Sequence, residues 1–99
     1  MICSNNVDVD PGTVIYTAML NSNGGIEADV TVTRISEEEF WIFTGAATSN
    51  RTLNWIKNNT PPKSTVFLYD ITSSYGVIGL MGPKSRALLK HLTGDELSN

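Results

Sequence analysis

The fold is decided by residues 13–35, TVIYTAMLNSNGGIEADVTVTRI. Residues 13–20 are rich in β-branched and aromatic types, which is typical of a strand. Residues 21–25, NSNGG, accept positive φ angles and therefore predict a turn. In residues 26–35 apolar and polar side chains alternate, which indicates a strand with one buried face and one polar face. We therefore predict a β-hairpin.

Beyond the hairpin, the sequence predicts a strand, a helix, two further strands and a last helix. The predicted strands are residues 40–44, 65–71 and 75–81. The first helix is capped by Thr48 or Ser49 and ends at about Asn58, and the last helix begins at Gly82-Pro83 and stops before Gly94. The order β-β-β-α-β-β-α predicts an α+β fold, in which two helices cover one face of a mainly antiparallel sheet.

The length of 99 residues allows one compact domain and excludes two. Because both ends of the chain are abrupt, we expect a single partial domain over residues 1–99. Within it, residues 1–11 form an extended lead-in and residues 95–99 an open tail. The remaining lobes of a longer parent protein would then be its partners.

Composition excludes several functions. A net charge of −3 does not suit binding to phosphate backbones, so we expect no nucleic-acid partner. No apolar run approaches the roughly 20 residues of a membrane span, so we expect no membrane partner. A single cysteine, Cys3, and a single histidine, His91, do not make a metal site. No glycine-rich dinucleotide motif is present, so the chain contains no flavin or nicotinamide domain.

The polar face of the hairpin carries the candidate site. Every register that keeps the two apolar sets together places Tyr16 and Asp29 on one face, opposite or diagonal to each other. A phenol beside a carboxylate can flank a flat nitrogen heterocycle. From the strand pattern alone, a solvated surface carboxylate at Asp29 is the more common case.

Two motif blocks resemble the aminomethyltransferase (glycine cleavage T-protein) family. They are residues 16–21, YTAMLN, and residues 24–29, GGIEAD, with further similarity at residues 70–72 and 82–86. Within this family the resemblance points to the folate-binding half of mitochondrial sarcosine and dimethylglycine dehydrogenases. The pyruvate dehydrogenase phosphatase regulatory subunit is similar over the same span.

The resemblance implies a function for the parent protein, in which an amine-derived one-carbon unit is captured on tetrahydrofolate. It implies that Asp29 is the catalytic carboxylate near N5 of the folate, and that Asp29 and Tyr16 bind this cofactor. It further implies FAD only in a separate domain of the parent, and a location in the mitochondrial matrix. The chain departs from the T-protein pattern at Thr33, where many members have tyrosine, and at residues 44–46, TGA instead of VNA.

Two alternatives stay open. The parent could be a regulatory subunit that kept the fold and lost the chemistry, like the phosphatase subunit. The chain could also be an isolated acidic α+β domain without a known activity.

Overall fold

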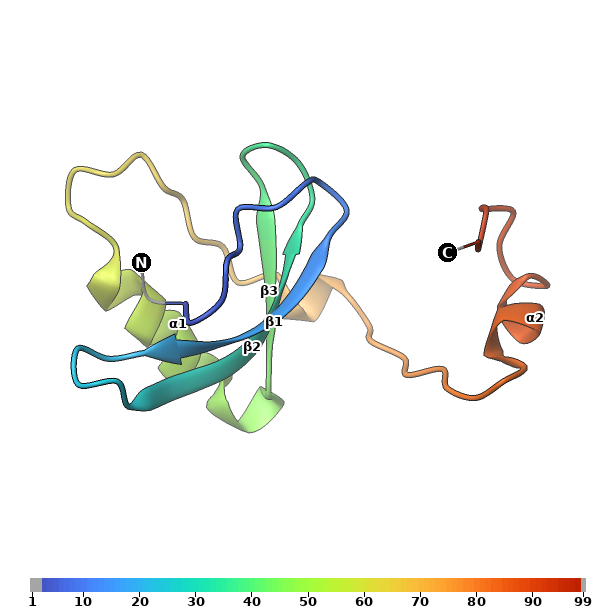
Figure 1. Cartoon of the computed structure of the whole chain (residues 1–99), viewed down its shortest axis with the longest axis horizontal. Coiled ribbons are helices and arrows are strands. Elements are labelled where there is room, and N and C mark those ends of the chain that lie inside the picture. Colours follow the sequence, from blue (N-terminus) through green and yellow to red (C-terminus); the bar gives the residue numbers. More distant parts are fainter. Residues whose placement is uncertain (1–2, 99) are drawn as a thin grey trace. The chain divides into compact units, whose positions relative to one another are not determined.

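The computed structural model describes residues 3–98 of the chain (Figure 1). The first two residues of the expected lead-in and the last residue of the expected tail lie outside this range. Within it the elements are β1 (Val14–Leu20), β2 (Ile26–Arg34), β3 (Phe40–Thr44), the 3-10 turn η1 (Ala46–Thr48), α1 (Ser49–Asn59), the 3-10 turn η2 (Thr72–Ser74) and α2 (Ser85–Leu89). The chain divides into two compact units, one up to Tyr69 and one from Asp70 onward. The α+β class predicted from the sequence is confirmed.

The hairpin forms as predicted. β1 and β2 pair antiparallel with Thr17 opposite Val30, and β3 pairs antiparallel with the other side of β2. The turn between β1 and β2 closes with the Asn21 N–H donating to Gly25 O at 2.9 Å and the Gly24 N–H donating to Asn21 O at 3.0 Å. Gly24 has a φ of +79°, which glycine adopts without the steric cost that a Cβ would add.

Helix α1 covers one face of the sheet. The buried core on this face consists of Met19, Ala28, Val30 and Val32, and Trp55 and Ile56 of α1 pack against it. The alternation in β2 thus buries Ala28, Val30 and Val32 as the sequence pattern predicts, whereas Ile26, at the end of the strand where the register shifts, is 69% exposed. The opposite face of the sheet, which carries the polar positions of β2, does not face this helix.

The start of α1 departs in detail from the expected cap. Thr48 is the N-cap residue, but its side chain makes no capping hydrogen bond. Instead the Thr48 hydroxyl donates to Gly45 O at 3.1 Å, within the 3-10 turn that precedes the helix. The helix ends at Asn59, one residue beyond the predicted end, before the two prolines.

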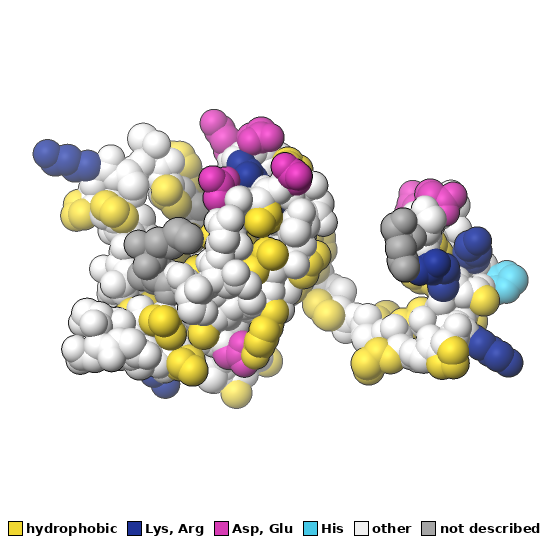
Figure 2. All heavy atoms as spheres, in the orientation of Figure 1, with side chains coloured by type: hydrophobic (Ala, Val, Ile, Leu, Met, Phe, Trp, Pro, Cys, Tyr) yellow, Lys and Arg dark blue, Asp and Glu magenta, His cyan; other side chains and the backbone are white. Residues whose placement is uncertain are grey.

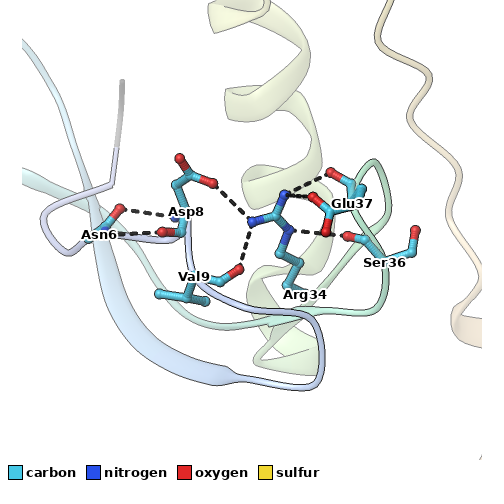
Figure 3. A network of polar contacts seen from close by, with 6 residues as sticks. All are labelled: Asn6, Asp8, Val9, Arg34, Ser36 and Glu37. Atoms are coloured by element: carbon cyan, nitrogen blue, oxygen red, sulfur yellow. Dashed lines mark hydrogen bonds and ion pairs between the residues drawn. The ribbon is translucent and has the colours of Figure 1, made fainter.

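Arg34 joins the lead-in to the turn between β2 and β3 (Figure 3). Its Nη1 donates to Asp8 Oδ1 at 2.9 Å and to Val9 O at 2.6 Å. Its Nη2 donates to both Glu37 O and Glu37 Oε2 at 3.0 Å, and its Nε donates to Ser36 O at 3.2 Å. Acidic side chains gather around one basic group at an end of the sheet unit (Figure 2).

The prediction of strands at residues 65–71 and 75–81 is wrong. Both segments are irregular, and most of their apolar side chains are exposed, with Val77 at 82% and Ile78 at 91%. A strand requires a neighbour that accepts and donates its backbone hydrogen bonds. Among the described residues β1, β2 and β3 form the sheet, and none of them pairs with either segment.

The last helix is shorter than predicted. Residues 82–84 form a turn in which Gly82 has a φ of +117°, and α2 begins only at Ser85 and ends at Leu89. The leucines of the predicted helix are exposed, Leu88 at 55% and Leu92 at 79%. Helices in proteins depend on packing of an apolar face, so the unburied leucines account for the short length.

Candidate functional site

A shallow depression lies on the face of the sheet opposite α1. Its volume is about 280 Å³, and it is open to solvent. The lining residues are Tyr16, Asp29, Val30, Thr31, Phe43, Thr44 and Gly45. The depression therefore spans all three strands and contains both residues that the sequence predicted for the site.

Tyr16 and Asp29 lie diagonally across the β1–β2 pair. Tyr16 is directly opposite Thr31, and Asp29 precedes Thr31 by two residues, so all three side chains share one face. The Tyr16 hydroxyl donates a hydrogen bond to Asp29 Oδ2 at 2.7 Å. The predicted arrangement on one face is confirmed, in its diagonal form.

The hydrogen bond changes the acidity of the phenol. Donation to the Asp29 carboxylate raises the pKa of Tyr16, and desolvation and the negative charge of Asp29 raise it further. Tyr16 therefore stays protonated and remains a donor at neutral pH. Oδ1 of Asp29 has no hydrogen-bond partner among the described residues and is available to a ligand.

The lead-in holds the backbone of β1 beside this pair. The Ser4 N–H donates to Ala18 O at 2.8 Å, and the Asn5 N–H donates to the hydroxyl of Thr17 at 3.1 Å. The Asn5 side-chain amide reaches Tyr16 O at 3.4 Å. Because Thr17 is 3% exposed, this contact fixes the outer strand on the side facing the core while Tyr16 points to the open face.

A second polar cluster supports the hairpin from α1. β1 and β2 lose register between Met19 and Leu20, and Glu27 is left without a partner on β1. The Glu27 carboxylate binds Asn21 Nδ2 and Arg51 Nη2, both at 2.8 Å. The hydrogen bond from Asn21, followed by that from Arg51, lowers the pKa of Glu27. Glu27 thus leaves the polar face on which the sequence pattern placed it with Asp29.

Five of the seven lining residues were missed by the sequence reasoning, and two of them, Thr31 and Phe43, lie in one row with Tyr16. Thr31 lies between Tyr16 on β1 and Phe43 on β3, directly opposite both. The alternation of β2 already places Thr31 on the face of Asp29. Phe43 could have been found by extending the same alternation across the short turn into β3, where it falls on that face.

Other potential chemistry is sparse in the described part of the chain. Within residues 3–98 no three His, Cys, Asp or Glu side chains lie together as metal ligands. Partial burial raises the pKa of the Cys3 thiol, so this thiol is a weaker nucleophile than that of a fully exposed cysteine. None of the helices in this range has the length and the apolar composition of a membrane span.

Comparison with known proteins identifies the class. The family described as the GCVT N-terminal domain matches residues 1–99. The chain therefore belongs to this family, which confirms the membership that the motif blocks predicted. No solved structure matches the chain significantly.

Three curated relatives show what the chain is similar to. It is 33% identical to a 4-methylaminobutanoate oxidase (formaldehyde-forming) of Paenarthrobacter nicotinovorans, over all of this chain and 12% of the oxidase. It is 29% identical to an aminomethyltransferase of Natranaerobius thermophilus, over 98% of this chain and 26% of the relative. It is 29% identical to the mitochondrial pyruvate dehydrogenase phosphatase regulatory subunit of Mus musculus, over 90% of this chain and 10% of the relative. The chain thus spans between a tenth and about a quarter of the length of these relatives.

Proposed function

We propose that this chain forms part of a tetrahydrofolate site in an aminomethyltransferase-like protein that captures an amine-derived one-carbon unit. The observation that carries the proposal is the hydrogen bond of 2.7 Å between Tyr16 and Asp29 inside the depression. The similarity to an aminomethyltransferase and to an amine oxidase described as formaldehyde-forming supports it. Both relatives bear names that involve one-carbon units or methylated amines.

Asp29 is the group to which we assign the chemistry. A nitrogen that attacks a one-carbon electrophile becomes positively charged and must lose a proton. A carboxylate beside that nitrogen stabilises the cation and accepts the proton. Tyr16 donates to Oδ2 and orients the carboxylate without neutralising it, which leaves Oδ1 to contact the ligand.

The parent protein would be of the sarcosine or dimethylglycine dehydrogenase type. In that proposal the FAD that oxidises the amine lies in a separate domain, and the remaining lobes of the parent complete the folate cavity around this depression. The proposed location is the mitochondrial matrix. The mitochondrial name of the mouse relative supports an organelle address.

The test uses the intact protein that carries this chain. Tetrahydrofolate binding is measured by calorimetry, and methylene-tetrahydrofolate formation is measured during amine oxidation, for the wild type and for Asp29→Asn. We expect the wild type to bind folate, and the variant to oxidise the amine normally while folate product falls by about 100-fold, as on loss of a general base. An unchanged yield of the folate product in Asp29→Asn would refute the assignment.

A regulatory subunit is the second candidate, favoured by the similarity to the phosphatase regulatory subunit. Such a protein would keep the sheet and α1 for contact with partners and would not need the depression. The same calorimetric titration separates the two candidates. A regulatory protein gives no heat of folate binding at any tested concentration, whereas the proposed site saturates.

A further inference from the structure

We propose that Phe43 is the second aromatic wall of the site, and that the flat ring of the ligand inserts between Phe43 and Tyr16, above Thr31. This inference rests on the proposed function and specifies how the same site recognises its ligand. The sequence motifs point to Tyr16 and Asp29 only. The contribution of β3 follows from the strand register.

The register places three side chains in one row across the sheet. Tyr16 of β1 is opposite Thr31 of β2, which is in turn opposite Phe43 of β3. Neighbouring strands lie about 4.8 Å apart, so the bases of the two aromatic side chains are about 10 Å apart. A ring in contact with an aromatic face on each side needs about 7 to 8 Å, at contact distances of about 3.5 to 4.0 Å. The gap therefore admits one ring.

Thr31 suits the floor of this gap. Its side chain is short, so it leaves the space between the two walls open. All three residues line the depression. Asp29 also lines it, in the neighbouring row of side chains on the same face, two residues before Thr31 on β2. A ring held above Thr31 thus presents its edge to the carboxylate, which is the orientation that proton transfer from a ring nitrogen requires.

The Phe43 ring is partly exposed, and the neighbouring Trp41 ring holds it in place. Phe43 is 43% exposed, and Tyr16 is 69% exposed, so both rings present area that a ligand would cover. The Trp41 ring lies on the same face with its centroid 6.4 Å from that of Phe43 and tilted by 57°. Trp41 Nε1 donates to Glu39 Oε1 at 2.8 Å, which anchors the indole that Phe43 rests against. This support lowers the entropy that Phe43 loses on binding a ring.

The experiment measures tetrahydrofolate affinity by calorimetry in the intact protein. We expect Phe43→Leu, which removes the ring and keeps an apolar side chain, to weaken binding by about 10-fold, as on loss of one aromatic stack. We expect Phe43→Tyr, which keeps the ring, to bind within about threefold of the wild type. Phe67→Leu is the matched control, because Phe67 is 77% exposed and lies outside the depression.

A second variant tests the gap itself. Thr31→Tyr fills the space between the walls with a residue that favours strands, so it should abolish folate binding while the thermal unfolding midpoint stays close to that of the wild type. Equal affinities for Phe43→Leu, Thr31→Tyr and the wild type would overturn the inference and leave the proposed function intact. Absence of folate binding in the wild type would overturn both.

Discussion

The Tyr16 hydroxyl lies 2.7 Å from Asp29 Oδ2, although the two residues are 13 positions apart and on different strands. The contact exists because the hairpin register offsets the two residues by two positions, a diagonal that a long phenol spans. A directly opposite pair would bring the carboxylate against the ring edge instead of the hydroxyl. The diagonal therefore makes Tyr16 a donor that orients Asp29.

The acidity of Tyr16 tests this contact. In the 99-residue chain with Tyr69→Phe and Tyr75→Phe, Tyr16 is the remaining tyrosine and its phenolate absorbance can be titrated. We expect Asp29→Asn to lower the pKa of Tyr16 toward the usual value, because the variant removes the charged acceptor that raises it. A Tyr16 pKa that is the same in both backgrounds would contradict the hydrogen bond.

The same shift has a consequence for stability. Because the pKa of Tyr16 is raised in the folded state, the folded protein holds this proton more tightly than the unfolded chain does. The stabilisation is fully present below the usual tyrosine pKa of about 10 and is lost as the pH rises through the folded-state value. Urea titrations should show a steeper alkaline loss of stability in the wild type than in Tyr16→Phe.

Glu27 gives the opposite pH dependence. Its pKa is lowered by Asn21 and Arg51, so its stabilisation is present above the usual glutamate pKa and is lost as the pH falls through the lowered value. We expect acidification from pH 7 to pH 3 to destabilise the wild type more than Glu27→Gln in urea titrations. Glu38→Gln, at an exposed turn position, is the matched control and should follow the wild type. Identical acid sensitivity in wild type and Glu27→Gln would show that the cluster does not support the hairpin.

The sequence predicted the sheet unit well because its signals are local. Alternation identified the buried face of β2, and NSNGG identified the turn, since both depend on neighbours within a few residues. The position of Glu27 was predicted less well. Glu27 is unpaired with β1 and contacts Arg51 because the strand register shifts between Met19 and Leu20. No residue type in the sequence predicts this shift.

The second half of the chain was predicted poorly for a different reason. Residues 65–71 and 75–81 have strand-forming composition, but strand formation also requires a partner, and the described residues supply none. The site shows the same distinction. Asp29 and Tyr16 could be placed from motifs and alternation. Alternation extended into β3 puts Phe43 on the same face, but its place directly opposite Thr31 depends on the register of β3 against β2.

Two valine-to-alanine substitutions compare the stability contributed by a buried position and by an exposed one. Val30 is 2% exposed against α1, whereas Val77 is 82% exposed in a segment that the sequence assigned to a strand. We expect Val30→Ala to lower the free energy of unfolding by about 2 kcal/mol, from lost burial and the cavity left behind. Val77→Ala should change it by less than about 0.5 kcal/mol, as at other exposed positions. Equal losses in urea titrations of the two variants would place residues 75–81 in a packed core.

Replacement of Arg34 tests the tie between the lead-in and the turn after β2. The guanidinium donates to oxygens of Asp8 and Val9 on one side and of Ser36 and Glu37 on the other. A lysine ammonium has three donors at one point and does not reach both sides, so Arg34→Lys should lose the carbonyl contacts although it keeps the charge. We expect a loss of about 1 to 2 kcal/mol in the free energy of unfolding, because the Arg34 side chain is only 13% exposed.

Asp8→Asn separates the ion pair from the carbonyl contacts: Asp8 is 86% exposed, so its loss should cost less than about 1 kcal/mol. Equal losses in the two variants would mean that the charge pair, and not the five-donor geometry, holds the lead-in in place.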